Sequence, residues 1–229
     1  MDSSPRDISE LIFQKVFIIE GDDYLLPNRV LQQAWRSMRH LQEVGPKRIV
    51  DVERTVREVA ETGYLGKPVL RADYQNTAQL TILIDASPSM VAFAGLAEKI
   101  IRTAGQDRHF RDLRVFYFDN VPEDYLFRSP GLKDPLDIAD FLMQPRQAVL
   151  VFSDAGAARG LLNWERVSDT LDFMQLINTP HFVWINPMPR ERWEHSTAEV
   201  IALKTGVMFA SDSLEFRNAI KQLRGKLKT

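Results

Sequence analysis

The stretch QLTILIDASPSM, residues 79–90, decides how the rest of the chain is interpreted. An apolar run ends abruptly at Asp85, and Ser87 and Ser89 follow around a proline, a composition that favours a tight turn after a buried strand. One carboxylate and two hydroxyls at alternating positions are hard oxygen donors that suit a small divalent cation. A phosphate-binding turn would need glycines, and the first glycine after this run is Gly95. The sequence therefore predicts a buried strand that ends in a cation site.

Downstream of this strand, apolar runs alternate with helical patterns to the end of the chain. Further strands are expected at residues 113–119, 124–127 (a short edge strand), 147–154, 181–187 and 206–210. Helices are expected between and after them, at residues 91–105, 134–143, 163–177, 196–204 and 211–227. Continuously apolar strands that alternate with helices are typical of a mostly parallel sheet covered on both faces. The sequence thus predicts a doubly wound, Rossmann-like α/β fold.

Polar residues stand at the expected carboxyl ends of four of these strands. They are Asp85 with its two serines, Asp119 with Asn120, Ser153 with Asp154, and Asn186. In open α/β sheets, ligands bind outside the carboxyl ends of the strands, where the strand order reverses. We therefore expect these residues to gather around one site.

Residues 1–76 differ in character from the α/β domain, which we assign to residues 77–229. A short strand is expected at residues 15–20, and two helices follow it. The first helix starts after Pro27 with one face formed by Val30, Ala34, Met38 and Leu41, and Gly45 is expected to end it. The second is expected to be capped by Asp51, to turn Val52, Val56 and Val59 inward, and to end at Gly63. Packing on the sheet or on each other is the simplest role for this helical extension, and docking of a partner is the alternative.

Composition narrows the classes of function. A chain of 229 residues with 45% hydrophobic and 26% charged residues has the make-up of an ordinary globular protein. Its formal charge of -2 provides no broad attraction for nucleic acid or an anionic membrane. No run is long enough for a membrane span, and the polar start does not resemble a signal peptide, so a cytoplasmic location is expected. The absence of cysteine and the scatter of four histidines argue against a zinc site.

The strand that ends in DASPS and the later strand that ends in FSD resemble the von Willebrand factor A (vWA) family. The metal-ion-dependent adhesion site (MIDAS) of that family uses a D-x-S-x-S motif after one strand and an aspartate after another. The resemblance implies that Asp85, Ser87 and Ser89 are metal ligands and that Asp154 joins them directly or through water. Mg²⁺ is the expected ion, with Mn²⁺ or Ca²⁺ as alternatives, and a position open to a partner's group is expected on it.

One ligand of the family pattern is missing from this chain. The family usually has a threonine in the loop between the two motifs, and the matching position here is Leu136, which has no ligand atom. Ser129 and Asp134 are candidates to replace it from other points of that loop. Arg159 and Asn186 are further candidates for partner binding, although a surface arginine and a turn-forming asparagine are the simpler interpretations.

A narrower resemblance covers nearly the whole chain. The segments DVERTVREVAETGYLGKPVL, FSDAGAARG and VWINPMPRERW are similar to the CoxE-like bacterial branch of the vWA family, which is associated with MoxR-type AAA+ ATPases. This resemblance implies a non-catalytic adaptor whose protein partner is such an ATPase or its client and offers an acidic side chain. A role in a bacterial stress or defence assembly would follow.

The alternative hypothesis is a Mg²⁺-dependent hydrolase or phosphoryl-transfer enzyme that uses Asp85, Asp119 and Asp154. Ser87 stands where a haloacid-dehalogenase-type site needs its second aspartate, and Asn186 stands where a receiver-like site needs lysine. The chain also has no GxxxxGK[ST] motif, so hydrolysis of ATP would belong to a partner. The interaction module is therefore the favoured prediction.

Overall fold

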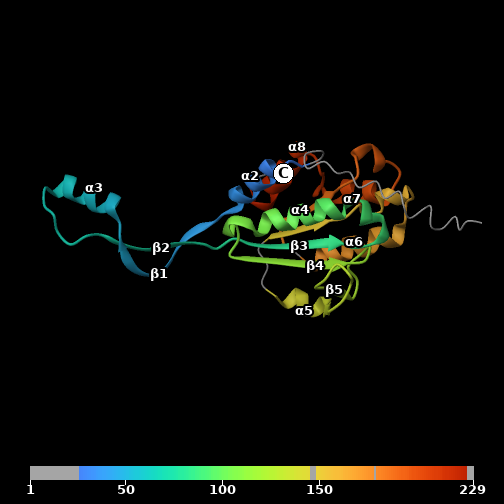
Figure 1. The fold of residues 1–229 in the computed structure, drawn as a ribbon, viewed down its shortest axis with the longest axis horizontal. Coiled ribbons are helices and arrows are strands. Elements are labelled where there is room, and N and C mark those ends of the chain that lie inside the picture. The colour runs from blue at the N-terminus through green and yellow to red at the C-terminus, as the bar shows by residue number, and fades with distance from the viewer. Residues whose placement is uncertain (1–25, 145–147, 178, 226–229) are drawn as a thin grey trace, which may run out of the picture.

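The structure, a computed structural model, describes residues 26–144, 148–177 and 179–225 (Figure 1). The strand predicted at residues 15–20 lies outside these ranges.

One seven-stranded sheet forms the centre of the molecule. Its strands are β3 (Gln79–Asp85), β4 (Asp112–Phe118), β5 (Tyr125–Phe127), β6 (Pro135–Asp137), β7 (Ala148–Phe152), β8 (Phe182–Asn186) and β9 (Met208–Ala210). The order across the sheet is β6-β5-β4-β3-β7-β8-β9. The strands from β4 to β9 in this order run parallel, whereas β5 and β6 are antiparallel at one edge. The predicted α/β fold with a mostly parallel sheet is confirmed.

The position of β3 sets the place where a ligand is expected. The chain goes from β3 to β4 on one side and returns later to β7 on the other side, so the strand order reverses at β3. Asp85 is level with Phe118 of β4, and Ile84 is level with Phe152 of β7. Because ligands of open α/β sheets bind at such a switch point, the carboxyl end of β3 is the favoured site.

The helices mostly lie where the sequence predicts them. They are α2 (Asn28–Met38), α3 (Val52–Thr62), α4 (Ala94–Gly105), α5 (Ile138–Met143), α6 (Trp164–Ile177), α7 (Thr197–Thr205) and α8 (Ser213–Leu223). A 3-10 turn, η1 (Pro88–Phe93), precedes α4. The prediction of a helix over residues 134–143 is wrong at its start, because residues 135–137 form β6. Leu136 pairs with Leu126 and is buried there, and Asp137 then caps α5 by accepting a hydrogen bond from the N–H of Ala139.

Side chains of β3 alternate between two buried clusters, as expected for a strand. Leu80, Ile82 and Ile84 belong to a cluster that includes residues of α2, α4 and α8. Leu83 belongs to a second cluster, which includes residues of α5, α6 and α7. The sheet therefore separates two apolar cores, and β3 contributes to both.

Helix α2 is part of the first core. Its buried residues are Val30, Leu31, Ala34, Trp35 and Met38. Trp35 is fully buried, packs edge-to-face on Phe110 and Phe216, and donates a hydrogen bond from Nε1 to Thr103 Oγ1 at 3.0 Å. The first helix therefore packs on α4 and α8 and shares the first core with β3, while the domain boundary at residue 76 stays a prediction.

Residues 41–76 form an arm that projects from the body of the molecule and carries α3 (Figure 1). Its two strands, β1 (Leu41–Val50) and β2 (Leu70–Asn76), pair antiparallel and were not predicted. Leu41, expected on the first helix, starts β1 instead, and Gly45 lies at an irregularity of that strand and does not end a helix.

Helix α3 has the predicted ends but not the predicted packing. Asp51 accepts a hydrogen bond from the N–H of Arg54 at 3.0 Å, and Gly63 ends the helix with a φ of 70°. The expectation that Val52 and Val56 face inward is wrong, since they are 67% and 61% exposed. The reason is the arm, which holds α3 away from both cores (Figure 1).

Replacing Trp35 by alanine is expected to lower the free energy of unfolding by about 3–5 kcal/mol, because a buried aromatic side chain leaves a cavity. Urea denaturation measures this change. The matched control is Val56→Ala on the exposed face of α3, which should alter stability by less than about 0.5 kcal/mol. Equal stability of the parent and the Trp35→Ala protein would show that α2 does not belong to the cooperative core.

Candidate metal centre

Asp85 ends β3 with a side chain that is 2% exposed. Its Oδ1 accepts hydrogen bonds from the backbone N–H groups of Ser87 at 2.9 Å and Asn120 at 3.1 Å. Its Oδ2 accepts a hydrogen bond from Ser153 Oγ at 2.7 Å. Asn120 has a φ of 66°, a conformation that asparagine adopts more readily than most residues. The carboxylate thus joins the segments that follow β3, β4 and β7.

Ser87 and Ser89 form the turn after Asp85. Ser87 is buried and Ser89 half-buried, and their hydroxyl oxygens are 3.1 Å apart. The backbone of Ser87 is extended, and η1 begins directly after it at Pro88. Two ligands at adjacent corners of an octahedral Mg²⁺ site, with bonds of about 2.1 Å, lie about 3.0 Å apart. The spacing of the two hydroxyls is that of a hydrogen bond between them, and it is also compatible with two ligands of the predicted ion.

Asp154 lies just beyond β7 and is 2% exposed. Its Oδ1 accepts a hydrogen bond from the N–H of Gly156 at 3.1 Å, and its Oδ2 accepts one from the N–H of Ala158 at 3.0 Å. Asn186 Nδ2 donates to the backbone carbonyl of Asp154 at 2.8 Å. Each carboxylate oxygen keeps acceptor capacity beyond these bonds, so Asp154 can contact a cation directly or through water.

Burial raises the pKa of Asp85 above its usual value, and the hydrogen bonds from Ser153, Ser87 and Asn120 oppose this rise. Burial is the larger effect because it removes water from the charged form. A bound cation would act in the opposite direction, since it favours the ionised carboxylate. A nearby positive charge would therefore stabilise the ionised form of the Asp85 carboxylate, which burial disfavours.

The other predicted partner-binding residues differ in their burial and in their hydrogen bonds. Asn186 is fully buried and supports the turn that holds Asp154. The hydroxyl of Ser129 is engaged within its own turn, with the backbone of Lys133, and Asp134 is exposed. Arg159 is exposed.

The loop between β5 and β6 nevertheless approaches the site. Its Pro130 lines a cavity of about 510 Å³ together with Asp85 and Ser87, and apolar residues of α4 line much of the rest. Leu136 is 8% exposed and belongs to the second core, so this position provides an apolar contact.

The hydrolase hypothesis requires Asp119, which follows β4. This residue is exposed, and the hypothesis stays a prediction.

Arg166 is the residue near the site that the sequence interpretation missed. It lies on α6 and is 7% exposed, and its Nε has no hydrogen-bond partner among the described residues. Burial, followed by Arg159, lowers the pKa of Arg166, while Asp154 and Asp85 act to raise it. The sequence pattern that could have revealed it is helical spacing: Arg166 falls on the same face of α6 as the buried residues Thr170, Phe173 and Ile177.

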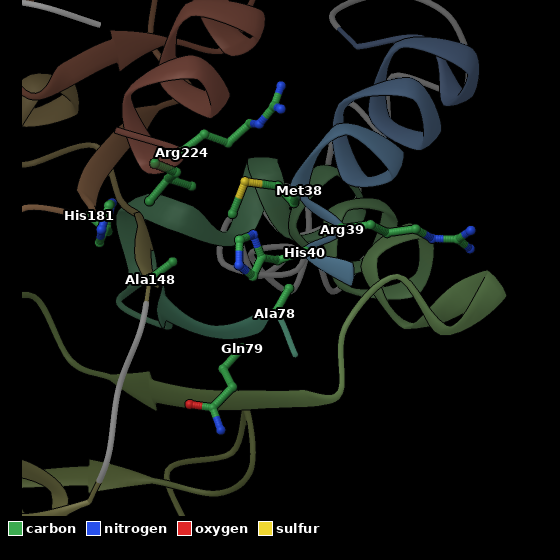
Figure 2. A pocket seen from close by; sticks show the side chains of 9 residues that line it. Met38, Arg39, His40, Ala78, Gln79, Ala148, His181 and Arg224 are labelled. Carbon is green, nitrogen blue, oxygen red and sulfur yellow. The ribbon is translucent and has the colours of Figure 1, made fainter. Parts of the chain in front are cut away.

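A second cavity, of about 360 Å³, lies at the amino ends of β3 and β7, where Gln79 and Ala148 line it (Figure 2). His40 points into this space, whereas the guanidinium groups of Arg39 and Arg224 point away from it (Figure 2). A strand of this length separates it from Asp85 by about 20 Å. It is therefore distinct from the candidate metal centre.

Comparison of the chain with protein-family models, with curated proteins and with solved structures gave no match. In the described part of the chain, no three His, Cys, Asp or Glu side chains gather as a metal site, so an ion at β3 would depend on the serine hydroxyls. Among the helices of those residues, none is both long and apolar enough to cross a membrane.

Asp85→Asn is expected to change how stability depends on pH. The raised pKa means that the native state holds the Asp85 proton at pH values where the unfolded state has lost it. This contribution to the parent's free energy of unfolding is full below the unfolded pKa and is lost as pH rises through the native pKa. Asparagine does not titrate, so the variant should gain stability relative to the parent as pH rises through this window.

Urea denaturation over a pH series with a chelator present measures this difference. Asp119→Asn, an exposed acid at the neighbouring strand end, is the control and should track the parent. A constant difference between Asp85→Asn and the parent at all pH values would contradict the assignment of a burial-raised pKa.

Proposed function

We propose that this chain is a non-catalytic protein-interaction module of the vWA type, in which Mg²⁺ at the end of β3 joins it to a partner protein. The observation that carries the proposal is the convergence of Asp85, Ser87 and Ser89 at the switch point of the sheet, with the serine hydroxyls 3.1 Å apart. Asp154 at the end of the adjacent strand supports it as a further oxygen ligand.

The proposed fold is doubly wound, with helices on both faces of the sheet. The two buried clusters support this arrangement, since alternate side chains of β3 contribute to different clusters and each cluster includes its own set of helices. The D-x-S-x-S motif then lies after the first strand of the sheet domain, as the resemblance to the vWA family implies.

The protein's own contribution to the site is to hold its ligands in place. Ser153 and the N–H of Asn120 fix Asp85, and the N–H groups of Gly156 and Ala158 fix Asp154. Such supporting contacts orient ligands and raise metal affinity. When bound, Mg²⁺ supplies a Lewis-acidic position for an oxygen of the partner, so an acidic side chain is the group we expect there.

The cavity beside the site gives the module a means of selecting its partner. Val91, Ala94, Ala97 and Ile101 give it an apolar wall next to Asp85 and Ser87. An acidic residue flanked by an apolar side chain would place its carboxylate at the ion and its neighbour in the cavity. Contacts of this second kind provide specificity that metal coordination alone does not.

The arm offers a second contact surface. Its large exposed apolar residues include Val52, Val56, Tyr64 and Leu65. Contiguous exposed apolar residues often mark interaction sites. The resemblance to the CoxE-like branch implies a MoxR-type AAA+ ATPase or its client as the partner, and a cytoplasmic adaptor in a stress or defence assembly as the role.

Ser87→Ala combined with Ser89→Ala is expected to abolish Mg²⁺-dependent capture of the partner, because both hydroxyl ligands are lost while the fold is retained. The measurement is a pull-down with a MoxR-type ATPase from the same organism, in Mg²⁺ and in excess EDTA. Asp119→Asn, which removes an exposed charge at a neighbouring strand end, is the control and should bind as the parent does.

Capture that persists in EDTA would contradict the metal bridge. Turnover of a phosphoester by the purified parent, lost in Asp85→Asn, would contradict the non-catalytic proposal and favour the hydrolase.

Val52→Asp combined with Val56→Asp is expected to weaken capture of the same partner by at least about tenfold, because charges replace apolar contacts at the interface. Thermal unfolding should be almost unchanged, since neither residue is buried. Arg57→Asp is the matched control, because it alters the net charge by the same amount at an exposed position of α3. Equal loss in both variants would show that net charge, and not the apolar face, controls binding.

A further inference from the structure

Arg166 is a buried cation for which the proposed function so far has no use. It is the third residue of α6, it is 7% exposed, and its Nε lacks a hydrogen-bond partner in the described ranges. Burying a guanidinium group without full hydrogen bonding is unfavourable. Such a group in a native structure needs an explanation.

The guanidinium group lies against the turn that holds Asp154. A Cβ atom added to Gly156 would lie 2.5 Å from Arg166 Nη1 and 3.3 Å from the Cβ of Thr197. A side chain at this position would displace the guanidinium group, and the φ of 82° favours glycine there. The same Gly156 donates its N–H to Asp154 Oδ1, so the guanidinium group of Arg166, which lies on α6, packs against the turn that holds this carboxylate.

The charges of Asp154 and Asp85, the two acids of the candidate metal centre, affect the pKa of Arg166. Asp154 and Asp85 stabilise its charged form, whereas burial and Arg159 oppose it. The carboxylates already accept hydrogen bonds from other donors, from Ser153 and backbone N–H groups. Arg166 is thus placed to act on them through its charge at a distance.

We propose that Arg166 is a built-in counter-charge that lowers the affinity of the metal centre for a divalent cation until a partner carboxylate arrives. The positive charge offsets part of the negative charge of Asp85 and Asp154 and repels the incoming ion. A carboxylate from the partner restores the missing negative charge, so cation and partner bind cooperatively. This inference rests on the proposed function, because it concerns the regulation of the same site.

The test measures binding of Mn²⁺, as the metal alone, by calorimetry and by electron paramagnetic resonance. Arg166→Met keeps the length of the side chain and removes its charge, and it should lower the Kd for Mn²⁺ by at least about tenfold. Arg166→Lys retains the charge and should bind within about threefold of the parent. Arg159→Met removes an exposed charge nearby and is the matched control, with a smaller expected change because solvent screens it.

The outcomes separate this inference from the proposed function. Suppose that the parent binds Mn²⁺ and that Ser87→Ala abolishes this binding. Unchanged or weaker binding in Arg166→Met would then contradict the counter-charge role of Arg166, while the metal site itself would be supported. Absence of Mn²⁺ binding from the parent and all variants would overturn both. If Arg166→Met does not fold, Arg166→Gln provides the same comparison with a polar side chain.

Discussion

The buried carboxylate of Asp85 is the interaction on which the site depends. Its two oxygens accept hydrogen bonds from segments that follow three adjacent strands, through Ser87, Asn120 and Ser153. An unpaired buried charge would destabilise the fold, so these donors are needed even without an ion. They also fix the direction of the carboxylate, which is what a metal site requires. Structural and functional demands therefore coincide at the end of β3.

The balance of charge around Asp85 suggests how such a site is regulated. Asp154 adds a second buried acid on the adjacent strand, and Arg166 adds a buried cation behind the turn that holds it. In the proposed module, the charges of Asp85, Asp154 and Arg166 are balanced only when both the ion and the partner's carboxylate are bound. The cavity beside Ser87 and the apolar face of α3 extend the contact beyond the ion, so that specificity need not come from coordination chemistry.

The sequence was sufficient to predict the long strands β3, β4, β7 and β8, because their apolar runs are continuous and end at proline or acidic residues, whereas β6 was predicted as the start of a helix. It placed Asp85 and Asp154 at strand ends for the same reason, and the structure shows that these two strands are neighbours. The arm was missed because β1 and β2 are largely exposed and carry no alternating apolar pattern that marks a half-buried strand. Arg166 was missed because its importance arises from packing of its side chain, on α6, against the turn at Gly156, a contact that helical spacing alone does not reveal.

In the proposed module, Ser87 and Ser89 are ligands of a divalent cation and not simply a pair of hydrogen-bonded hydroxyls. A crystal of the protein equilibrated with Mn²⁺ tests this most directly, by anomalous scattering at the manganese edge. We expect an anomalous peak about 2.1 Å from both hydroxyl oxygens, with Asp85 and Asp154 beside it. An ordered site without a peak, in which the two hydroxyls still bond to each other, would contradict it.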